Sequence, residues 1–156
     1  AGRRRSRQER RWAENIHGAL LDSGEEDIGL FLKTINASIA EILSDGDKGR
    51  DDLLPFLRSV FLEFHDVDIG KGACCDFLID VAPKPSPVPR VRFIFAIKFY
   101  SGEENIPDHR LMAGKIIERV IAEGGIIEEG IRETELIAIS ISDDGQYASK
   151  RQSIKP

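Results

Sequence analysis

The segment "DFLIDVAPKPSPVPRVRFIFAIKFY", Asp76–Tyr100, decides the fold. Its two ends are apolar and rich in β-branched and aromatic residues, which favour strands. Its middle, "APKPSPVPR" at 82–90, holds four prolines, and proline cannot donate a hydrogen bond inside a sheet. We therefore expect a strand at 73–81, a loop, and a second strand at 91–100 that pairs antiparallel with the first.

Helices are expected before this pair of strands. Apolar residues recur at helical spacing over 6–21 and again, as a clean amphipathic stripe, over 28–43. The polar run "SDGDKGRDD" at 44–52 is predicted as a loop. Its last residue, Asp52, is the expected cap of a third helix, which would tolerate Pro55 in its first turn.

The remaining segments complete an α/β pattern. "HDVDIGKG" at 65–72 indicates a short strand and a glycine turn. Asp108 is the predicted N-cap of a helix that ends at Gly124–Gly125, and "TELIAISIS" at 134–142 is predicted as a strand. "DDGQYASKRQSIKP" at 143–156 is expected to be a polar tail. The order is α-α-α-β-β-β-α-β, in which the first three strands form a meander and the last lies parallel to a neighbour.

Composition favours an intracellular protein with no membrane segment. The chain has 156 residues, of which 41% are hydrophobic, enough for one core. No apolar run approaches the roughly 20 residues that a membrane helix needs. Cys74 and Cys75 are adjacent and form no CxxC pair, so we expect reduced, mostly buried thiols on opposite faces of their strand, and no zinc cluster. Because the chain begins at Ala1 rather than Met, we expect either a fragment of a larger protein or a trimmed chain.

The charge of the chain is uneven. The first twelve residues hold six arginines and one glutamate, whereas the whole chain has a net charge of -5. The acidic remainder does not suit non-specific binding to DNA, but the basic arm with Arg3, Arg4 and Arg5 is a candidate contact for phosphates, RNA or an acidic partner. His109, Arg110 and Lys115, near the start of the last helix, are further candidates because helix N-termini favour anions. The alternative for all six is a solvated surface.

Alternation along the two central strands places Asp76, Asp80, Ala96 and Lys98 on one face. A register that sets Asp80 opposite Arg92 also sets Asp76 opposite Ala96, with Lys98 diagonally close. Simpler alternatives remain for these residues: an ion pair for Asp80, a strand cap for Asp76 and a surface position for Lys98.

The order helix, three strands, helix, strand, together with these residues, resembles the PD-(D/E)xK nuclease superfamily over about 51–142. The resemblance implies a restriction-endonuclease-like core, a mixed sheet flanked by helices. We expect this core to follow an N-terminal helical segment with the basic arm at 1–50 and to precede the tail at 143–156. The family motif is short, so the order of the helices and strands supports the resemblance more strongly than the motif residues do.

In that family an aspartate begins the second core strand, and an acidic residue, any residue and a lysine end the third. Asp76 and Lys98 match the first and last of these. The resemblance implies that Asp76 binds Mg²⁺ or Mn²⁺ and that Lys98 assists the attacking water. It also implies a helix glutamate and a backbone carbonyl as ligands, for which Glu63 and Ile97 are the candidates. Mg²⁺ prefers carboxylate oxygens and water, and it neutralises the charge that develops in phosphodiester cleavage.

The sequence departs from the motif at Ala96, which has no ligand atom where the family has a carboxylate. Three explanations are open: a change made in the laboratory, a loss in evolution, or an accidental resemblance. Under either of the first two explanations, Asp80 is the candidate for a carboxylate that binds the metal from a different position in the sequence. The hypothesis is a metal-dependent nuclease domain that acts on DNA rather than RNA, is inactive or weak in this chain, and regains cleavage in Ala96→Glu.

The alternative hypothesis is a non-catalytic nuclease-like module that binds protein or nucleic acid. Amphipathic helices before the core would support a homodimer or docking to a larger protein. Binding of Mg²⁺ or Mn²⁺ that disappears in Asp76→Ala would favour the nuclease, and no metal binding would favour the module.

Overall fold

The computed structural model describes seven segments of the chain: 28–62, 65–72, 74–84, 91–100, 108–124, 131–142 and 146–154. The chain divides into two compact units, 1–60 and 61–156. The helix expected at 6–21 lies outside the described residues. None of the described helices is both long and apolar enough to cross a membrane.

The first unit contains helix α2 (Ile28–Leu43) and most of helix α3 (Asp47–Phe61). The predicted helix at 28–43 is confirmed, and its apolar stripe is buried: Leu32, Ile35, Ile39, Ile42 and Leu43. Burial of this stripe follows from apolar residues at helical spacing.

The loop expected at 44–52 is wrong in its second half, because α3 begins at Asp47 and is not capped by Asp52. Gly46 makes the corner with a φ of 68°, a conformation that glycine adopts without strain. Gly49 packs against the end of α2, since an added Cβ would lie 1.8 Å from the carbonyl oxygen of Ile42. The glycine-rich polar run therefore forms a tight turn between two helices.

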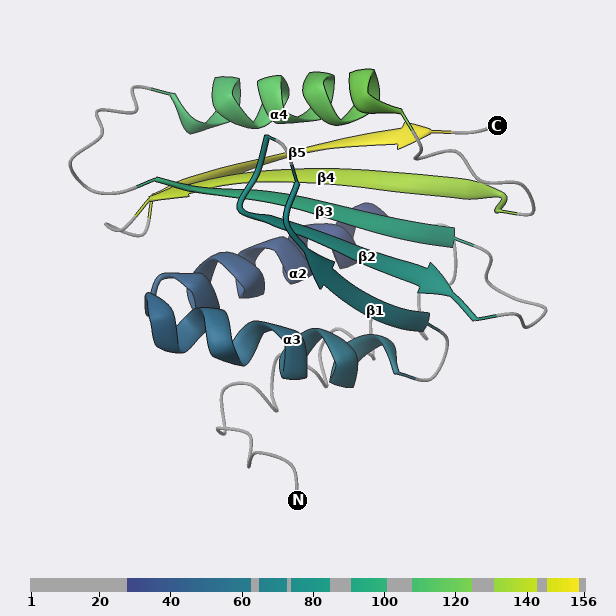
Figure 1. The fold of residues 1–156 in the computed structure, drawn as a ribbon, viewed down its shortest axis with the longest axis horizontal. Helices are drawn as coiled ribbons and strands as arrows, with labels where there is room; N and C mark the ends of the chain where they lie inside the picture. Colours follow the sequence, from purple (N-terminus) through teal and green to yellow (C-terminus); the bar gives the residue numbers. More distant parts are fainter. Residues whose placement is uncertain are drawn as a thin grey trace. The chain divides into compact units, whose positions relative to one another are not determined.

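The second unit is built on a five-stranded mixed sheet with the strand order β1-β2-β3-β4-β5 (Figure 1). Its strands are β1 (His65–Gly70), β2 (Phe77–Pro83), β3 (Val91–Tyr100), β4 (Glu133–Ser142) and β5 (Tyr147–Ile154). The first three strands form the expected antiparallel meander, and β4 lies parallel to β3, as predicted. The chain therefore belongs to the α/β class.

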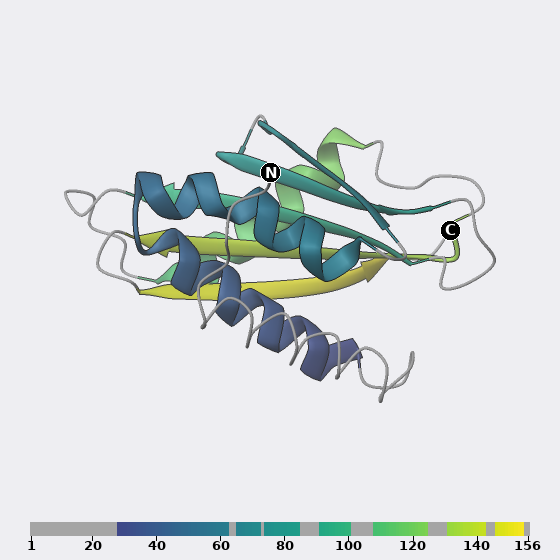
Figure 2. The same cartoon turned by 90° about the horizontal axis from the view of Figure 1, so that it is seen from below.

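Two strand predictions are wrong. The segment 143–156 is not a polar tail, because β5 pairs antiparallel with β4 along its whole length (Figure 2). A polar sequence suits an edge strand, whose backbone pairs while its side chains face water. β2 begins at Phe77 rather than at 73, so Cys74 and Cys75 lie in the connection from β1. That connection is needed because Gly70 pairs with Leu78.

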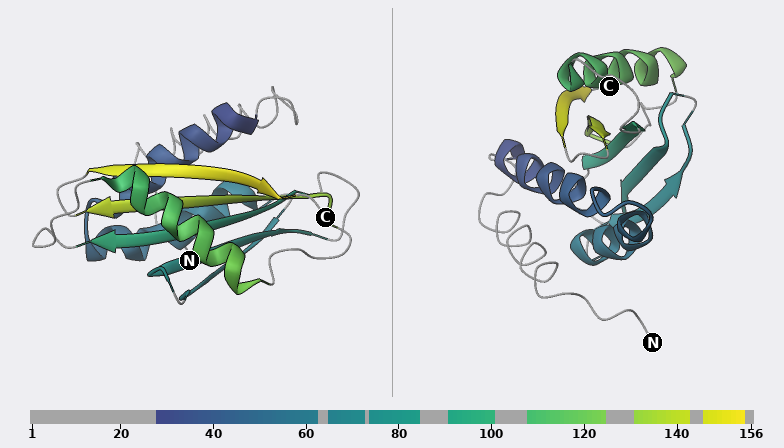
Figure 3. Two further views of the ribbon diagram at one scale, coloured as in Figure 1. Left: turned by 90° about the horizontal axis from the view of Figure 1, so that it is seen from above. Right: turned by 90° about the vertical axis from the view of Figure 1, so that its left-hand side faces the viewer.

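Helix α4 (His109–Glu123) lies across one face of this sheet (Figure 3). Asp108 caps its first turn and Gly124 ends it with a φ of 75°, so both predicted ends are confirmed. Even-numbered residues of β3 and β4 pack under the helix in an apolar cluster: Ile94, Ala96, Leu136 and Ala138, with Ala113, Ile116, Ile117 and Val120 from α4 and Cys75 from the β1–β2 connection. This cluster is called the α4 core below.

Candidate functional site

Asp76 and Lys98 meet at the start of β2 and near the end of β3. Lys98 Nζ lies 3.8 Å from Asp76 Oδ1, and the two side chains are 37% and 42% exposed. The other oxygen, Oδ2, accepts a hydrogen bond of 2.7 Å from the amide of Phe99. The amide of Asp76 in turn donates to the carbonyl of Ile97 at 2.9 Å. Backbone contacts to β3 therefore fix the carboxylate, and one of its oxygens stays beside the lysine and open to solvent.

The register between β2 and β3 differs from the expected one by two residues. Ala96 lies opposite Leu78 rather than opposite Asp76, and Asp80 lies opposite Ile94 rather than opposite Arg92. A shift by two keeps every side chain on its expected face, so the alternation of apolar residues does not exclude it. The shift brings Lys98, rather than Ala96, next to Asp76.

Ala96 belongs to the α4 core and not to the Asp76–Lys98 pair. It is fully buried, and its strand neighbour on β4 is Ala138. Ala113 of α4 packs in the same cluster. Three small side chains at this point let the helix lie close to the sheet, which leaves little space for a longer side chain at position 96.

Asp80 is held by Arg92 in a two-pronged ion pair. Arg92 Nε donates to Asp80 Oδ1 at 2.9 Å, and Arg92 Nη2 donates to Asp80 Oδ2 at 2.6 Å. Both carboxylate oxygens are therefore occupied, and the structural alternative predicted for this residue is confirmed. Asp80 is poorly placed to serve as a migrated metal ligand.

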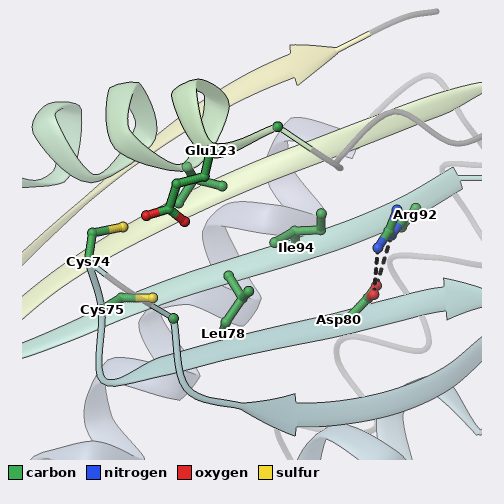
Figure 4. A pocket seen from close by; sticks show the side chains of 10 residues that line it. Cys74, Cys75, Leu78, Asp80, Arg92, Ile94 and Glu123 are labelled. Atoms are coloured by element: carbon green, nitrogen blue, oxygen red, sulfur yellow. Dashed lines mark hydrogen bonds and ion pairs between the residues drawn. The ribbon is translucent and has the colours of Figure 1, made fainter.

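A hollow of about 130 Å³ lies beside this ion pair (Figure 4). Cys74 and Glu123 line one end of it and the Asp80–Arg92 pair the other. Both cysteines are free, as expected. Burial is the main cause that raises the pKa of Cys75 to about 11, so its thiol is protonated at neutral pH and is a weak nucleophile.

His109 adds a further polar group near Lys98, on the side of β4. Its Nδ1 lies 2.7 Å from Ser140 Oγ, and its ring centroid lies 6.2 Å from that of Tyr100. Lys98 Nζ lies 5.8 Å from the same Tyr100 ring, and Lys98 is the strand partner of Ser140. These residues gather at the carboxyl ends of the parallel strands, the usual place for sites in α/β folds.

Sequence reasoning assigned no catalytic role to His109 and offered it only as a phosphate contact, with Arg110 and Lys115. The signals that were present are its place immediately after the Asp108 cap and the hydroxyl of Ser140 in an otherwise apolar strand. Each signal alone is weak, because a histidine at a helix start and a serine near a strand end are common surface choices.

Two further candidate residues lie on α4, outside this cluster. Arg110 and Lys115 are exposed on α4. The amides of Arg110 and Leu111 donate to Asp108 Oδ1 at 3.0 and 3.2 Å, so the cap already occupies donors that a phosphate would use. The other candidates lie outside the described residues: Glu63, Arg3, Arg4 and Arg5.

Two buried titratable residues lie on the opposite face of the sheet. Glu135 is fully buried, accepts a 2.6 Å hydrogen bond from Ser153 Oγ, and has Arg151 Nε 3.7 Å away. Burial is the main cause that raises its pKa, and Glu133 adds to the shift. Burial also lowers the pKa of His65, whose Nε2 lies 3.2 Å from the carbonyl oxygen of Val91.

The donor set near Asp76 fits a divalent cation that keeps much of its water. Asp76 Oδ1 accepts no hydrogen bond from a described residue, and the Ile97 carbonyl, which accepts one, has a second lone pair. Among the described residues, no three His, Cys, Asp or Glu side chains come together as a ligand group. Mg²⁺ is commonly bound by one or two carboxylates, water and substrate phosphate, which matches such a sparse set.

Comparisons with known proteins give no further information about the family. The similarity to PD-(D/E)xK nucleases stays a prediction from the sequence. The chain matched no family model, no curated protein and no solved structure.

Proposed function

We propose that this chain is a metal-dependent phosphodiesterase domain of the restriction-endonuclease-like type that acts on nucleic acid, DNA rather than RNA. The observation that carries the proposal is the solvent-open pair of Asp76 and Lys98, 3.8 Å apart on neighbouring strands. The order of three antiparallel strands, a helix and a parallel strand supports it. Free cysteines are consistent with an intracellular location.

Asp76 and the carbonyl of Ile97 would hold the cation. When bound, the cation supplies an activated water and neutralises charge on the phosphate. The Phe99 amide keeps the Asp76 carboxylate oriented through its 2.7 Å hydrogen bond. Lys98 holds its ammonium beside that carboxylate, where it can orient the attacking water and stabilise negative charge in the transition state. Because position 96 provides no second carboxylate, we expect a low rate.

The test is hydrolysis of end-labelled DNA and RNA oligonucleotides with Mg²⁺ or Mn²⁺, compared with the same reaction in a chelator. Wild type should cut DNA slowly, and Asp76→Asn and Lys98→Met should each abolish cutting. Glu118→Gln, an exposed position on α4, serves as the matched control and should cut like wild type. Cutting that survives in Asp76→Asn, or no cutting by wild type, would overturn the proposal.

A second candidate is a nuclease-like module that binds nucleic acid or protein without cutting. The burial of Ala96 favours it, because no carboxylate can be placed there without disturbing the α4 core. Calorimetric titration with Mn²⁺ separates the two candidates. Heat of binding that is lost in Asp76→Asn supports the phosphodiesterase, and DNA binding with no metal binding supports the module. Native mass spectrometry tests whether such a module forms a homodimer.

A further inference from the structure

His109 is positioned to take part in chemistry beside the Asp76–Lys98 pair. It is half-buried at the start of α4, and Ser140 Oγ holds its Nδ1 at 2.7 Å. Ser140 is itself fully buried, so it cannot act as a nucleophile toward a substrate in solution. A hydrogen bond to one ring nitrogen of histidine fixes the ring and determines what the other nitrogen can do. Ser140 therefore orients the ring, and Nε2 makes no hydrogen bond with the described part of the chain.

Lys98 and His109 both lie beside the ring of Tyr100. The Lys98 ammonium and the His109 ring lie 5.8 and 6.2 Å from the centroid of this buried ring. Ser140 and Lys98 are partners on adjacent parallel strands, which run about 4.8 Å apart. In phosphoryl transfer the attacking and leaving oxygens lie roughly in line on opposite sides of phosphorus. Such a reaction needs one group near each of these oxygens, and Lys98 and His109 are two such groups beside the same ring.

We propose that His109 is the general acid of the phosphodiesterase reaction and that Ser140 is its positioning residue, an inference that rests on the proposed function. Water attacks phosphorus beside Asp76 and Lys98, and its proton passes to solvent. The bond from phosphorus to the leaving oxygen breaks, and His109 Nε2 gives its proton to that oxygen. The products are a phosphomonoester and an alcohol, and the neutral imidazole recovers a proton from solvent.

Among the residues that the structure describes, the charged and titratable groups around His109 come from three elements. β3 contributes Tyr100 and Lys98, and Asp108 lies next to His109 at the cap of α4. β5 contributes Lys150, whose side chain runs against Gly114, more than one turn along the helix. The role of general acid requires the charged form of His109, in which Nε2 carries the proton that passes to the leaving oxygen.

The test compares two substrates that differ in their need for a general acid. The leaving group of an oligonucleotide is an alkoxide, which is poor, whereas the leaving group of bis(p-nitrophenyl) phosphate is a stable phenolate. His109→Gln should slow oligonucleotide hydrolysis on the order of 10²–10⁴-fold, the usual contribution of general acid–base catalysis, and should slow the nitrophenyl diester by less than about tenfold. Glu118→Gln should leave both rates unchanged.

The positioning role of Ser140 has its own readout. In Ser140→Ala the histidine remains, so the ¹⁵N chemical shifts of its two ring nitrogens should show a loss of the single fixed tautomer. The oligonucleotide rate should fall by less than in His109→Gln. Equal losses on both substrates in His109→Gln would overturn the role of His109 while the proposed function stands. Failure of wild type to hydrolyse either diester would overturn both proposals.

Discussion

Replacing Ala96 by glutamate tests how the α4 core relates to the candidate site. The sequence predicts that Ala96→Glu restores cleavage, because the family has a carboxylate there. The structure places this side chain under α4, with Ala113 and Ala138 in the same cluster. We therefore predict that Ala96→Glu destabilises the fold and does not raise the rate of hydrolysis.

The expected loss of stability has two parts. Extra methylene groups in a well-packed core cost about 1–3 kcal/mol. A buried carboxyl without a hydrogen-bond partner adds about 1–3 kcal/mol. The total of roughly 2–6 kcal/mol is a large share of the about 5–15 kcal/mol that stabilises a typical domain. Ala96→Met has a side chain of similar length with no charge, so it should show only the first part.

Urea unfolding followed by circular dichroism measures these losses. With a urea dependence of about 2 kcal/mol per molar, the midpoint of Ala96→Glu should fall by about 1–3 M relative to wild type. Unfolding in the presence of Mn²⁺ shows whether the new carboxyl group binds the ion or is only buried, because a ligand at 100 times its Kd stabilises the fold by about 2.7 kcal/mol. A glutamate variant that is as stable as wild type, or that gains both Mn²⁺-dependent stability and faster cutting, would refute the placement of position 96 in a sealed core.

Three further outcomes follow from the described contacts. Arg92→Leu leaves Asp80 without its two hydrogen bonds, so the free energy of unfolding should fall by about 1–3 kcal/mol; an unchanged urea midpoint would contradict this. The raised pKa of Glu135 means that its stabilising effect is present below its ordinary value of 4.5 and is lost as pH rises through the higher folded pKa. Glu135→Gln should thus flatten the decline in stability above pH 4.5, and an unaltered dependence of stability on pH would contradict the raised pKa of Glu135. Iodoacetamide at pH 8 should label Cys74 faster than Cys75, whose pKa is about 11, and peptide mass spectrometry measures the two rates. Equal labelling rates would contradict the raised pKa of Cys75.

The sequence predicted the elements whose apolar residues are regularly spaced. α2, β3, α4 and β4 appear within about one residue of their expected ranges, because burial of one face imposes the spacing. β5 was not predicted, because an edge strand needs no apolar side chains and therefore has no apolar alternation in the sequence. Near the start of α3, Gly49 packs closely against Ile42 of α2. In the sequence, the glycines and polar residues that allow this packing have the composition of a loop, so the start of the helix was not predicted.

The candidate site was predicted in part. Alternation placed Asp76 and Lys98 on one face, and the structure brings them together. The register was missed because the long connection between β2 and β3 does not determine it. The burial of Ala96 depends on where α4 crosses the sheet, and the contact of His109 with Ser140 joins residues 31 positions apart. Neither arrangement leaves a periodic signal in the sequence.

The central claim is that the Asp76 carboxylate, held beside Lys98, serves the cleavage of a phosphodiester. The most direct measurement is a single-turnover reaction with protein in excess over labelled DNA and with Mg²⁺, run for wild type and for Asp76→Asn at equal thermal stability. The account predicts slow cutting by wild type, none after removal of Mg²⁺, and none by Asp76→Asn. Equal cutting by the two proteins, or no cutting by either, would contradict it.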